Sequence, residues 1–171
     1  EKELPEDAFT AEAMEVKALC HRYGVPLLID DNVDVALKSG ADGVHVGIED
    51  TPVAEIRARA GRDFIIGSTA KTVEQARAAQ AAGADYLGVG AVFPSPTKKN
   101  AVRITVEQLR DICGSVTIPA VAIGGISLDN IRELRGGGMR GVAVISALFG
   151  ADDIAGAARA LKQEALSAVT R

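Results

Sequence analysis

Short apolar segments alternate along the chain with longer segments in which apolar residues recur every three or four positions. The short segments are rich in Val, Ile, Leu and Ala and predict strands, at Leu27–Ile29, Gly43–Val46, Phe64–Gly67, Tyr86–Val89, Ala120–Ile123 and Val142–Ile145. The longer segments predict helices, at Ala8–Tyr23, Val33–Ser39, Pro52–Arg59, Val73–Ala82, Val106–Cys113, Asn130–Leu134 and Asp152–Leu166. This alternation is typical of βα units built around a parallel sheet.

A similar sequence motif precedes several of the predicted strands. Ser39-Gly40-Ala41-Asp42-Gly43-Val44 resembles Ala82-Gly83-Ala84-Asp85-Tyr86-Leu87, and Gly138-Met139-Arg140-Gly141-Val142 occupies the same place before the last strand. Each copy of the motif combines a helix end, a glycine suited to the helix C-cap and the start of a strand. The motif therefore indicates that one kind of βα unit recurs along the chain.

The predicted fold class is α/β, a (β/α)8 TIM barrel. Such a barrel has eight strands, whereas this sequence carries six predicted strands after a leading helix. We therefore expect residues 1–171 to form a single TIM-barrel domain that is incomplete at its N-terminus and lacks the first two strands and the first helix. No linker or low-complexity stretch interrupts the sequence.

Composition excludes several classes of protein. Hydrophobic residues make up 47% and charged residues 25% of the sequence, which is ordinary for a soluble globular protein. A net charge of −4 argues against a nucleic-acid partner, and the lack of a long apolar run argues against a membrane. Cys20 and Cys113 match neither a disulfide framework nor a metal-ligand spacing, so we expect a reducing, cytoplasmic location.

Acidic residues follow the first two predicted strands. Asp30 and Asp31 follow the first strand, and Glu49 and Asp50 follow the second. The carboxyl ends of the strands form the active face of a TIM barrel, and carboxylates there suit a hard cation such as Mg2+. The competing interpretation is that Asp30 only caps the next helix.

Two further loops carry groups suited to a phosphorylated substrate. Gly67–Lys71 offers hydroxyls and an ammonium, although Ser68 or Thr69 would serve equally well as a helix N-cap. Gly90–Asn100 is long for a βα loop, and long ordered loops are often functional. Its donors for an anion are Ser95, Thr97 and Lys98. The alternative for this loop is a solvated surface segment.

Glycines and a serine follow the last two predicted strands. Gly124-Gly125 follows the fifth strand, and Ile145-Ser146 lies at the end of the sixth. Glycine lets backbone N–H groups approach an anion closely, and the last two strands of such barrels often carry a phosphate site. The pairing favours a phosphate site over two tight turns without a ligand.

Neither histidine is predicted to be catalytic. His21 is expected on the polar, solvated side of the first helix. His45 alternates with Val44 and Val46 in a strand, where packing is its expected role.

Five segments together form a recognisable pattern. They are Ile29-Asp30-Asp31-Asn32-Val33-Asp34, Gly43-Val44-His45-Val46-Gly47, Glu49-Asp50, Gly88-Val89-Gly90-Ala91-Val92-Phe93-Pro94-Ser95-Pro96-Thr97-Lys98-Lys99 and Val121-Ala122-Ile123-Gly124-Gly125-Ile126. In this order they resemble the thiamine-phosphate synthase family, over essentially the whole chain. The resemblance implies an Mg2+-dependent transferase of thiamine biosynthesis, which joins hydroxymethylpyrimidine pyrophosphate to a thiazole phosphate. Its partners would be these small molecules, and a homo-oligomer is compatible with it.

The resemblance also implies roles for individual residues. Asp31 and Asp50 match the family's Mg2+ ligands, and Lys2 and Lys98 match lysines that bind pyrophosphate and act in catalysis. The matched substrate-binding positions are Asp30, Thr69, Ser95, Thr97, Lys98, Gly125, Ile145 and Ser146, the last three at the thiazole-phosphate site. Two positions depart from the family pattern, because Asp30 stands where Asn is usual and Lys71 where many members have His.

Two other interpretations stay open at the level of sequence. One is a thiazole tautomerase-like paralogue, which has less need of Asp31, Asp50 and Lys98 and uses a histidine where Lys71 stands. The other is an inactive fragment that binds phosphorylated ligands. Metal-dependent formation of product would separate the synthase from both.

Overall fold

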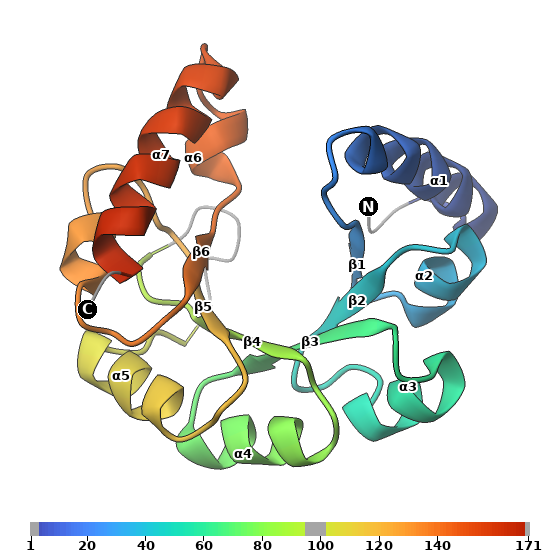
Figure 1. Cartoon of the computed structure of the whole chain (residues 1–171), viewed down its shortest axis with the longest axis horizontal. Helices are drawn as coiled ribbons and strands as arrows, with labels where there is room; N and C mark the ends of the chain where they lie inside the picture. Colours follow the sequence, from blue (N-terminus) through green and yellow to red (C-terminus); the bar gives the residue numbers. More distant parts are fainter. Residues whose placement is uncertain (1–3, 95–101, 170–171) are drawn as a thin grey trace. The chain divides into compact units, whose positions relative to one another are not determined.

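The computed structural model describes residues 4–94 and 102–169, which divide into two compact units. The first unit comprises residues 1–68 and 81–85, and the second comprises residues 69–80 and 86–171. Helices and parallel strands alternate in both units (Figure 1). None of the helices in the described part of the chain is long and apolar enough to cross a membrane.

The first unit is built on three parallel strands in chain order, β1 (Leu28–Asp30), β2 (Gly43–Val46) and the start of β3 (Ile65–Ala70). Its helices are α1 (Glu6–Arg22), α2 (Val33–Ser39) and α3 (Val53–Ala60). Helix α1 packs against α2 (Figure 1). The buried core of the unit contains Ile29, Val35, Val44, Val46, Ile56 and Ile66.

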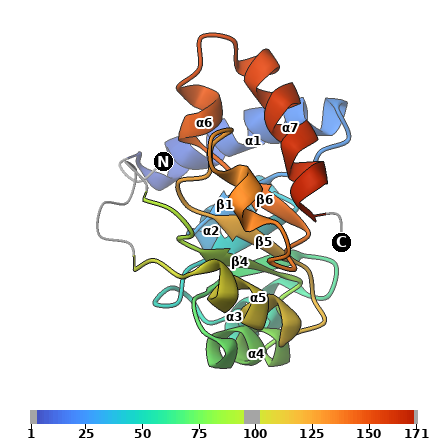
Figure 2. The same ribbon diagram turned by 90° about the vertical axis from the view of Figure 1, so that its left-hand side faces the viewer.

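The second unit is built on β4 (Tyr86–Gly90), β5 (Ala120–Ile123) and β6 (Gly141–Ala143), again parallel and in chain order. Its helices are α4 (Val73–Ala81), α5 (Val106–Gly114), the 3-10 helix η1 (Ile131–Leu134), α6 (Ser146–Phe149) and α7 (Ile154–Val169). Helix α7 packs against η1 and β6, and Figure 2 shows α7 beside β6. The buried core contains Leu87, Val89, Leu109, Ile112, Ile131 and Leu134.

The predicted alternation of strands and helices is confirmed, and some boundaries are corrected. The bounds of α2, β2 and β5 are those predicted, whereas β3 extends through Ala70, three residues beyond its expected end. The single turn of α6 was not predicted, because four residues are too few to display a helical period. Parallel strands separated by helices make an α/β fold that is consistent with a TIM-like barrel.

The recurring motif before the strands has a structural cause, which lies in the contacts of its aspartate. The amide of Asp42 donates to the carbonyl of Leu27 at 2.9 Å, and the amide of Leu27 returns a bond to a carboxylate oxygen of Asp42 at 2.7 Å. Asp85 and Ile66 make the same pair of bonds, at 2.8 and 2.7 Å. Each aspartate therefore joins the start of its own strand to the start of a preceding one.

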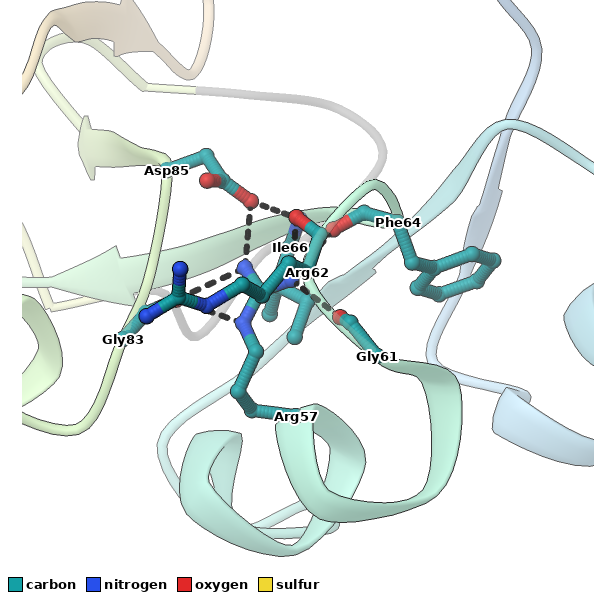
Figure 3. Close-up of polar contacts among 7 residues, drawn as sticks. All are labelled: Arg57, Gly61, Arg62, Phe64, Ile66, Gly83 and Asp85. Atoms are coloured by element: carbon teal, nitrogen blue, oxygen red, sulfur yellow. Dashed lines mark hydrogen bonds and ion pairs between the residues drawn. The ribbon is translucent and has the colours of Figure 1, made fainter.

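A basic side chain from a helix contacts each of these aspartates. Asp85 forms an ion pair with Arg57 at 2.6 Å, and Arg57 also donates to the carbonyls of Gly61, Phe64 and Gly83 at 2.7 to 2.8 Å (Figure 3). The guanidinium thus ties the end of α3 to the loops that precede β3 and β4. This arrangement uses the planar set of N–H donors that arginine provides.

His21 takes the corresponding place beside Asp42. Its Nε2 lies 2.8 Å from a carboxylate oxygen of Asp42, with the imidazole about half exposed. His21 is exposed, as expected, and its ring also links α1 to the start of β2. The amino ends of these strands are held together by charge-assisted hydrogen bonds.

Candidate functional site

Two aspartates lie at the carboxyl end of β1. Asp30 is the last residue of the strand and is exposed, and Asp31 follows it with φ of 62°. The amide of Asp31 donates to the carbonyl of His45 in β2 at 2.8 Å, which holds this backbone in place. A left-handed conformation in a residue other than glycine is strained, and such residues concentrate at functional sites.

The helix that follows β1 is capped by Asn32. Its Oδ1 accepts a hydrogen bond from the amide of Val35 at 2.9 Å. The competing interpretation, in which Asp30 caps this helix, is therefore wrong. Strand β1 continues to Asp30 and α2 begins at Val33, so the residue in the capping position is Asn32.

Asp50 lies in the turn after β2, and its Oδ2 accepts a hydrogen bond from the amide of Gly47 at 2.7 Å. A Cβ at position 47 would lie 2.7 Å from that same oxygen, so a larger residue there would displace the Asp50 side chain. Because β1 and β2 are parallel neighbours, Asp31 and Asp50 follow the same edge of the first unit.

Asp31 and Asp50 offer carboxylate oxygens of the kind that Mg2+ binds in proteins. Mg2+ takes oxygen ligands and is usually bound in proteins through one or two carboxylates together with phosphates. Within the described residues, no group of three or more His, Cys, Asp or Glu side chains is placed to hold a metal ion.

Thr69 lies within β3 and is half-buried, and the neighbouring Ser68 is buried. The expected alternative role of Ser68 or Thr69 as a helix cap is wrong, because the strand continues past both residues. Near the start of α4, the Oγ1 of Thr72 accepts the amide of Gln75 at 3.2 Å instead. The amide of Lys71 donates to the side chain of Gln75 at 2.8 Å.

The long loop after β4 is closed at its base by backbone hydrogen bonds. Val92 donates to Ile123 and Phe93 donates to Gly124, both at 3.0 Å, and Ile104 donates back to Ala91 at 3.0 Å. These bonds attach the loop to β5 and to the segment that enters α5. The predicted positions Ser95, Thr97 and Lys98 lie outside the described residues, as does Lys2.

The predicted phosphate-site residues Gly125, Ile145 and Ser146 follow adjacent strands at equivalent places. Ile123 of β5 pairs with Ala143 of β6, and Gly125 and Ile145 each come two residues later. Gly125 has φ of 63°, and a Cβ there would lie 2.1 Å from the carbonyl oxygen of Pro94. Ile145 and Ser146 are exposed at the start of α6. The second unit therefore brings these backbone segments to one edge of its sheet.

Asn130 contacts the same glycine loop and was not predicted as a site residue. Its Nδ2 donates to the carbonyl of Gly125 at 2.9 Å, and its Oδ1 accepts the amide of Ser127 at 2.9 Å. Asparagine often bonds to backbone groups near it in a turn, which was the available signal. The helical period of the following residues concealed this signal, because the sequence pattern is equally compatible with Asn130 as the first residue of a helix.

Comparison with known proteins gives one consistent family. The family model described as Thiamine monophosphate synthase matches residues 1–148. A thiamine-phosphate synthase of Caldivirga maquilingensis is 48% identical over 83% of this chain and 69% of its own length. That of Alkaliphilus oremlandii is 46% identical over 95% of this chain and 78% of its own.

Solved structures agree with this similarity. A thiamine phosphate pyrophosphorylase from Pyrococcus furiosus superimposes with a TM-score of 0.91 and 40% identity, covering 99% of this chain and 82% of its own. A 3-hexulose-6-phosphate synthase superimposes with a TM-score of 0.66 at 18% identity, which shows a shared fold alone.

Proposed function

The chain belongs to the thiamine monophosphate synthase family, and we propose that it condenses hydroxymethylpyrimidine pyrophosphate with a thiazole phosphate to give thiamine phosphate and pyrophosphate. This makes the protein a transferase of thiamine biosynthesis with two small-molecule substrates. A cytoplasmic location and a homo-oligomeric state form part of the proposal.

The observation that carries the proposal is the paired arrangement of Gly125 and Ile145 after adjacent parallel strands. Their offsets from the register pair Ile123 and Ala143 are the same, so backbone groups from two loops lie at one edge of the sheet. Backbone N–H groups, together with the Ser146 hydroxyl, are suited to holding a phosphate without a positive side chain. We assign this place to the thiazole phosphate.

Asp31 and Asp50 are the proposed ligands of a Mg2+ ion. When bound, the ion would neutralise charge on the pyrophosphate and help it to leave. Lys98 and Lys2 are proposed to bind the same pyrophosphate, and their ammonium groups would stabilise the negative charge that develops on it. Asp30, Thr69, Ser95 and Thr97 are the remaining proposed substrate contacts.

The reaction exchanges one bond for another at the methylene carbon of the pyrimidine. The bond from this carbon to the pyrophosphate oxygen breaks, and its electron pair leaves with pyrophosphate. The thiazole nitrogen supplies the pair for the new carbon–nitrogen bond. The chain's residues need only hold both substrates in line and stabilise the leaving charge, so positioning provides most of the rate enhancement.

An eight-stranded barrel, with two further strands and one further helix, also belongs to the proposal. The chain spans 82% of the P. furiosus relative.

The direct test is product formation from both substrates, with Mg2+ and with a chelator. Thiamine phosphate that forms with Mg2+ and disappears with chelator would support both the reaction and the metal. If the same amount of thiamine phosphate forms with and without the chelator, the proposed Mg2+ requirement is wrong. If no product forms in either case, the synthase proposal fails, and isomerisation of the thiazole substrate becomes the activity to assay.

A further inference from the structure

The carboxamide of Asn130 closes the turn that contains the proposed phosphate-binding glycine. Its Nδ2–H group is bonded to the carbonyl of Gly125, and its oxygen is bonded to the amide of Ser127. The turn is closed a second time by the backbone, because the amide of Ile131 donates to the carbonyl of Ser127 at 3.0 Å. Fixing the Gly125 carbonyl fixes the plane of the peptide that follows it.

The glycine loop needs such a restraint. Gly124 and Gly125 have φ of 101° and 63°, and glycine loses more conformational freedom on folding than other residues. Gly125 also packs directly on the backbone of Pro94, and the carbonyl of Gly124 accepts the amide of Phe93. A shift of Gly125 would therefore also move the segment that leads into the long loop after β4.

We propose that Asn130 is a positioning residue that presents the Gly125 loop to the phosphate of the thiazole substrate. The inference rests on the proposed function. It assigns Asn130 no contact with the substrate, and its effect passes through the backbone that it holds. Loss of the side chain should therefore weaken the binding of the phosphorylated thiazole more than that of the pyrimidine substrate.

The second unit offers a matched control at the opposite end of β5. The Gln80 side-chain oxygen accepts the amides of Thr117 and Ile118 at 2.7 and 3.2 Å. Gln80 and Asn130 are both half-buried carboxamides that hold a loop next to the same strand. Gln80→Ala should therefore cost comparable stability while leaving the glycine loop in place.

The experiment compares Asn130→Ala, Asn130→Asp and Gln80→Ala with the unchanged protein. Thermal melting and the kcat and KM for each substrate are measured for all four. Both Asn130 variants lose the hydrogen bond to the Gly125 carbonyl, and this shared loss predicts a KM for the thiazole phosphate raised about 3- to 10-fold. The KM for the pyrimidine substrate and the kcat should stay within about twofold. Gln80→Ala should change neither KM.

Asn130→Asp separates positioning from stability. Aspartate keeps the oxygen that accepts the Ser127 amide but loses the donor to Gly125, so its Tm should lie nearer to that of the unchanged protein than the Tm of Asn130→Ala. Its KM for the thiazole phosphate should nevertheless rise. The measurement is repeated at about 0.5 M salt, where screening weakens the effect of the added charge on the phosphate.

Two results would overturn the inference: an unchanged KM for the thiazole phosphate in both Asn130 variants, or an equal rise in Gln80→Ala. Inorganic phosphate provides a second readout that does not need the reaction. It should raise the Tm of the unchanged protein in a saturable way, with half-saturation moved to higher concentration by Asn130→Ala. If the unchanged protein makes no thiamine phosphate, the proposed function fails, and this phosphate titration still decides the role of Asn130.

Discussion

Aspartates at the two ends of the strands have different surroundings. At the amino ends, Asp42 and Asp85 accept backbone amides and contact His21 and Arg57, so their carboxylates serve the fold. At the carboxyl ends, Asp31 and Asp50 lie in turns, one of them in a strained backbone conformation. The residue type is the same in both places, and the chemistry differs because the surroundings do.

Asp50→Ala should abolish turnover, because it removes one of the two proposed Mg2+ ligands. The measurement is thiamine phosphate formation over a range of Mg2+ concentrations. Glu49→Ala is the control, since it removes a neighbouring exposed carboxylate that is not a proposed ligand. Near-normal activity in Asp50→Ala would contradict the metal assignment.

Gly125→Ala should raise the KM for the thiazole phosphate by more than tenfold, or prevent folding of the loop. The added Cβ would lie 2.1 Å from the Pro94 carbonyl oxygen, and φ of 63° is strained for alanine. Gly114→Ala is the control, because a Cβ at the end of α5 meets nothing within 4 Å. Equal kinetics for the two variants would move the phosphate site elsewhere.

At the scale of elements, each strand is connected at its amino end by a recurring set of contacts. The amide-to-carbonyl bond from residue 42 to Leu27 recurs from residue 85 to Ile66 and from Arg140 to Ala120. In the last case arginine replaces aspartate, so the backbone bond is kept without a carboxylate. The repeated motif therefore marks the place where a backbone hydrogen bond joins the starts of two strands, and its glycine permits the turn before that bond.

Arg57→Ala should destabilise the first unit by about 2 to 3 kcal/mol, because the part-buried carbonyls of Phe64 and Gly83 lose their donor together with the exposed carbonyl of Gly61. Urea unfolding measures this free energy. Arg59→Ala is the control, since Arg59 forms an exposed ion pair with Asp34 and such pairs contribute about 0 to 1 kcal/mol. A similar loss in both variants would contradict the structural role of Arg57.

Stability should depend on the Asp42 carboxylate under acid conditions. Burial raises its pKa, but the hydrogen bonds from His21 and the Leu27 amide outweigh burial and leave the pKa below its ordinary value of 3.8. The unfolded state then binds the proton more tightly, so this contribution is present above about pH 4 and is lost as the pH falls through the folded-state pKa.

Asp42→Asn should therefore flatten the pH dependence of unfolding free energy in the acid range. The measurement is urea unfolding at a series of pH values from about 3 to 6, compared with the unchanged protein. An identical slope in both proteins would show that Asp42 titrates alike in the folded and unfolded states.

At the scale of the whole molecule, the proposed metal ligands and phosphate loops belong to different compact units. Asp31 and Asp50 lie in the first unit, and Gly125, Ile145 and Ser146 lie in the second. Each set follows the carboxyl ends of parallel strands in its own unit. A ligand that binds either set stabilises the native state over the unfolded one.

Mg2+ and inorganic pyrophosphate together should raise the Tm more than the sum of their separate effects, because the metal is proposed to bind through both carboxylates and phosphate oxygens. Differential scanning fluorimetry with each ligand alone and with both measures this coupling. The excess should vanish in Asp50→Ala and persist in Glu49→Ala. Additive shifts in the unchanged protein would argue against a shared site.

The sequence by itself determined the alternation of strands and helices, the bounds of α2, β2 and β5, and the family. These features are local, because the hydrophobic period, the capping residues and the sequence motifs can each be recognised within a short stretch of chain. The tertiary structure decided what Asp42, Asp85, Arg57 and Asn130 do. Their partners are loop amides and carbonyls whose orientation depends on how the chain folds. The sequence pattern does not specify that orientation. The same reason explains why β3 continues through Thr69 and why Asn32, rather than Asp30, caps α2.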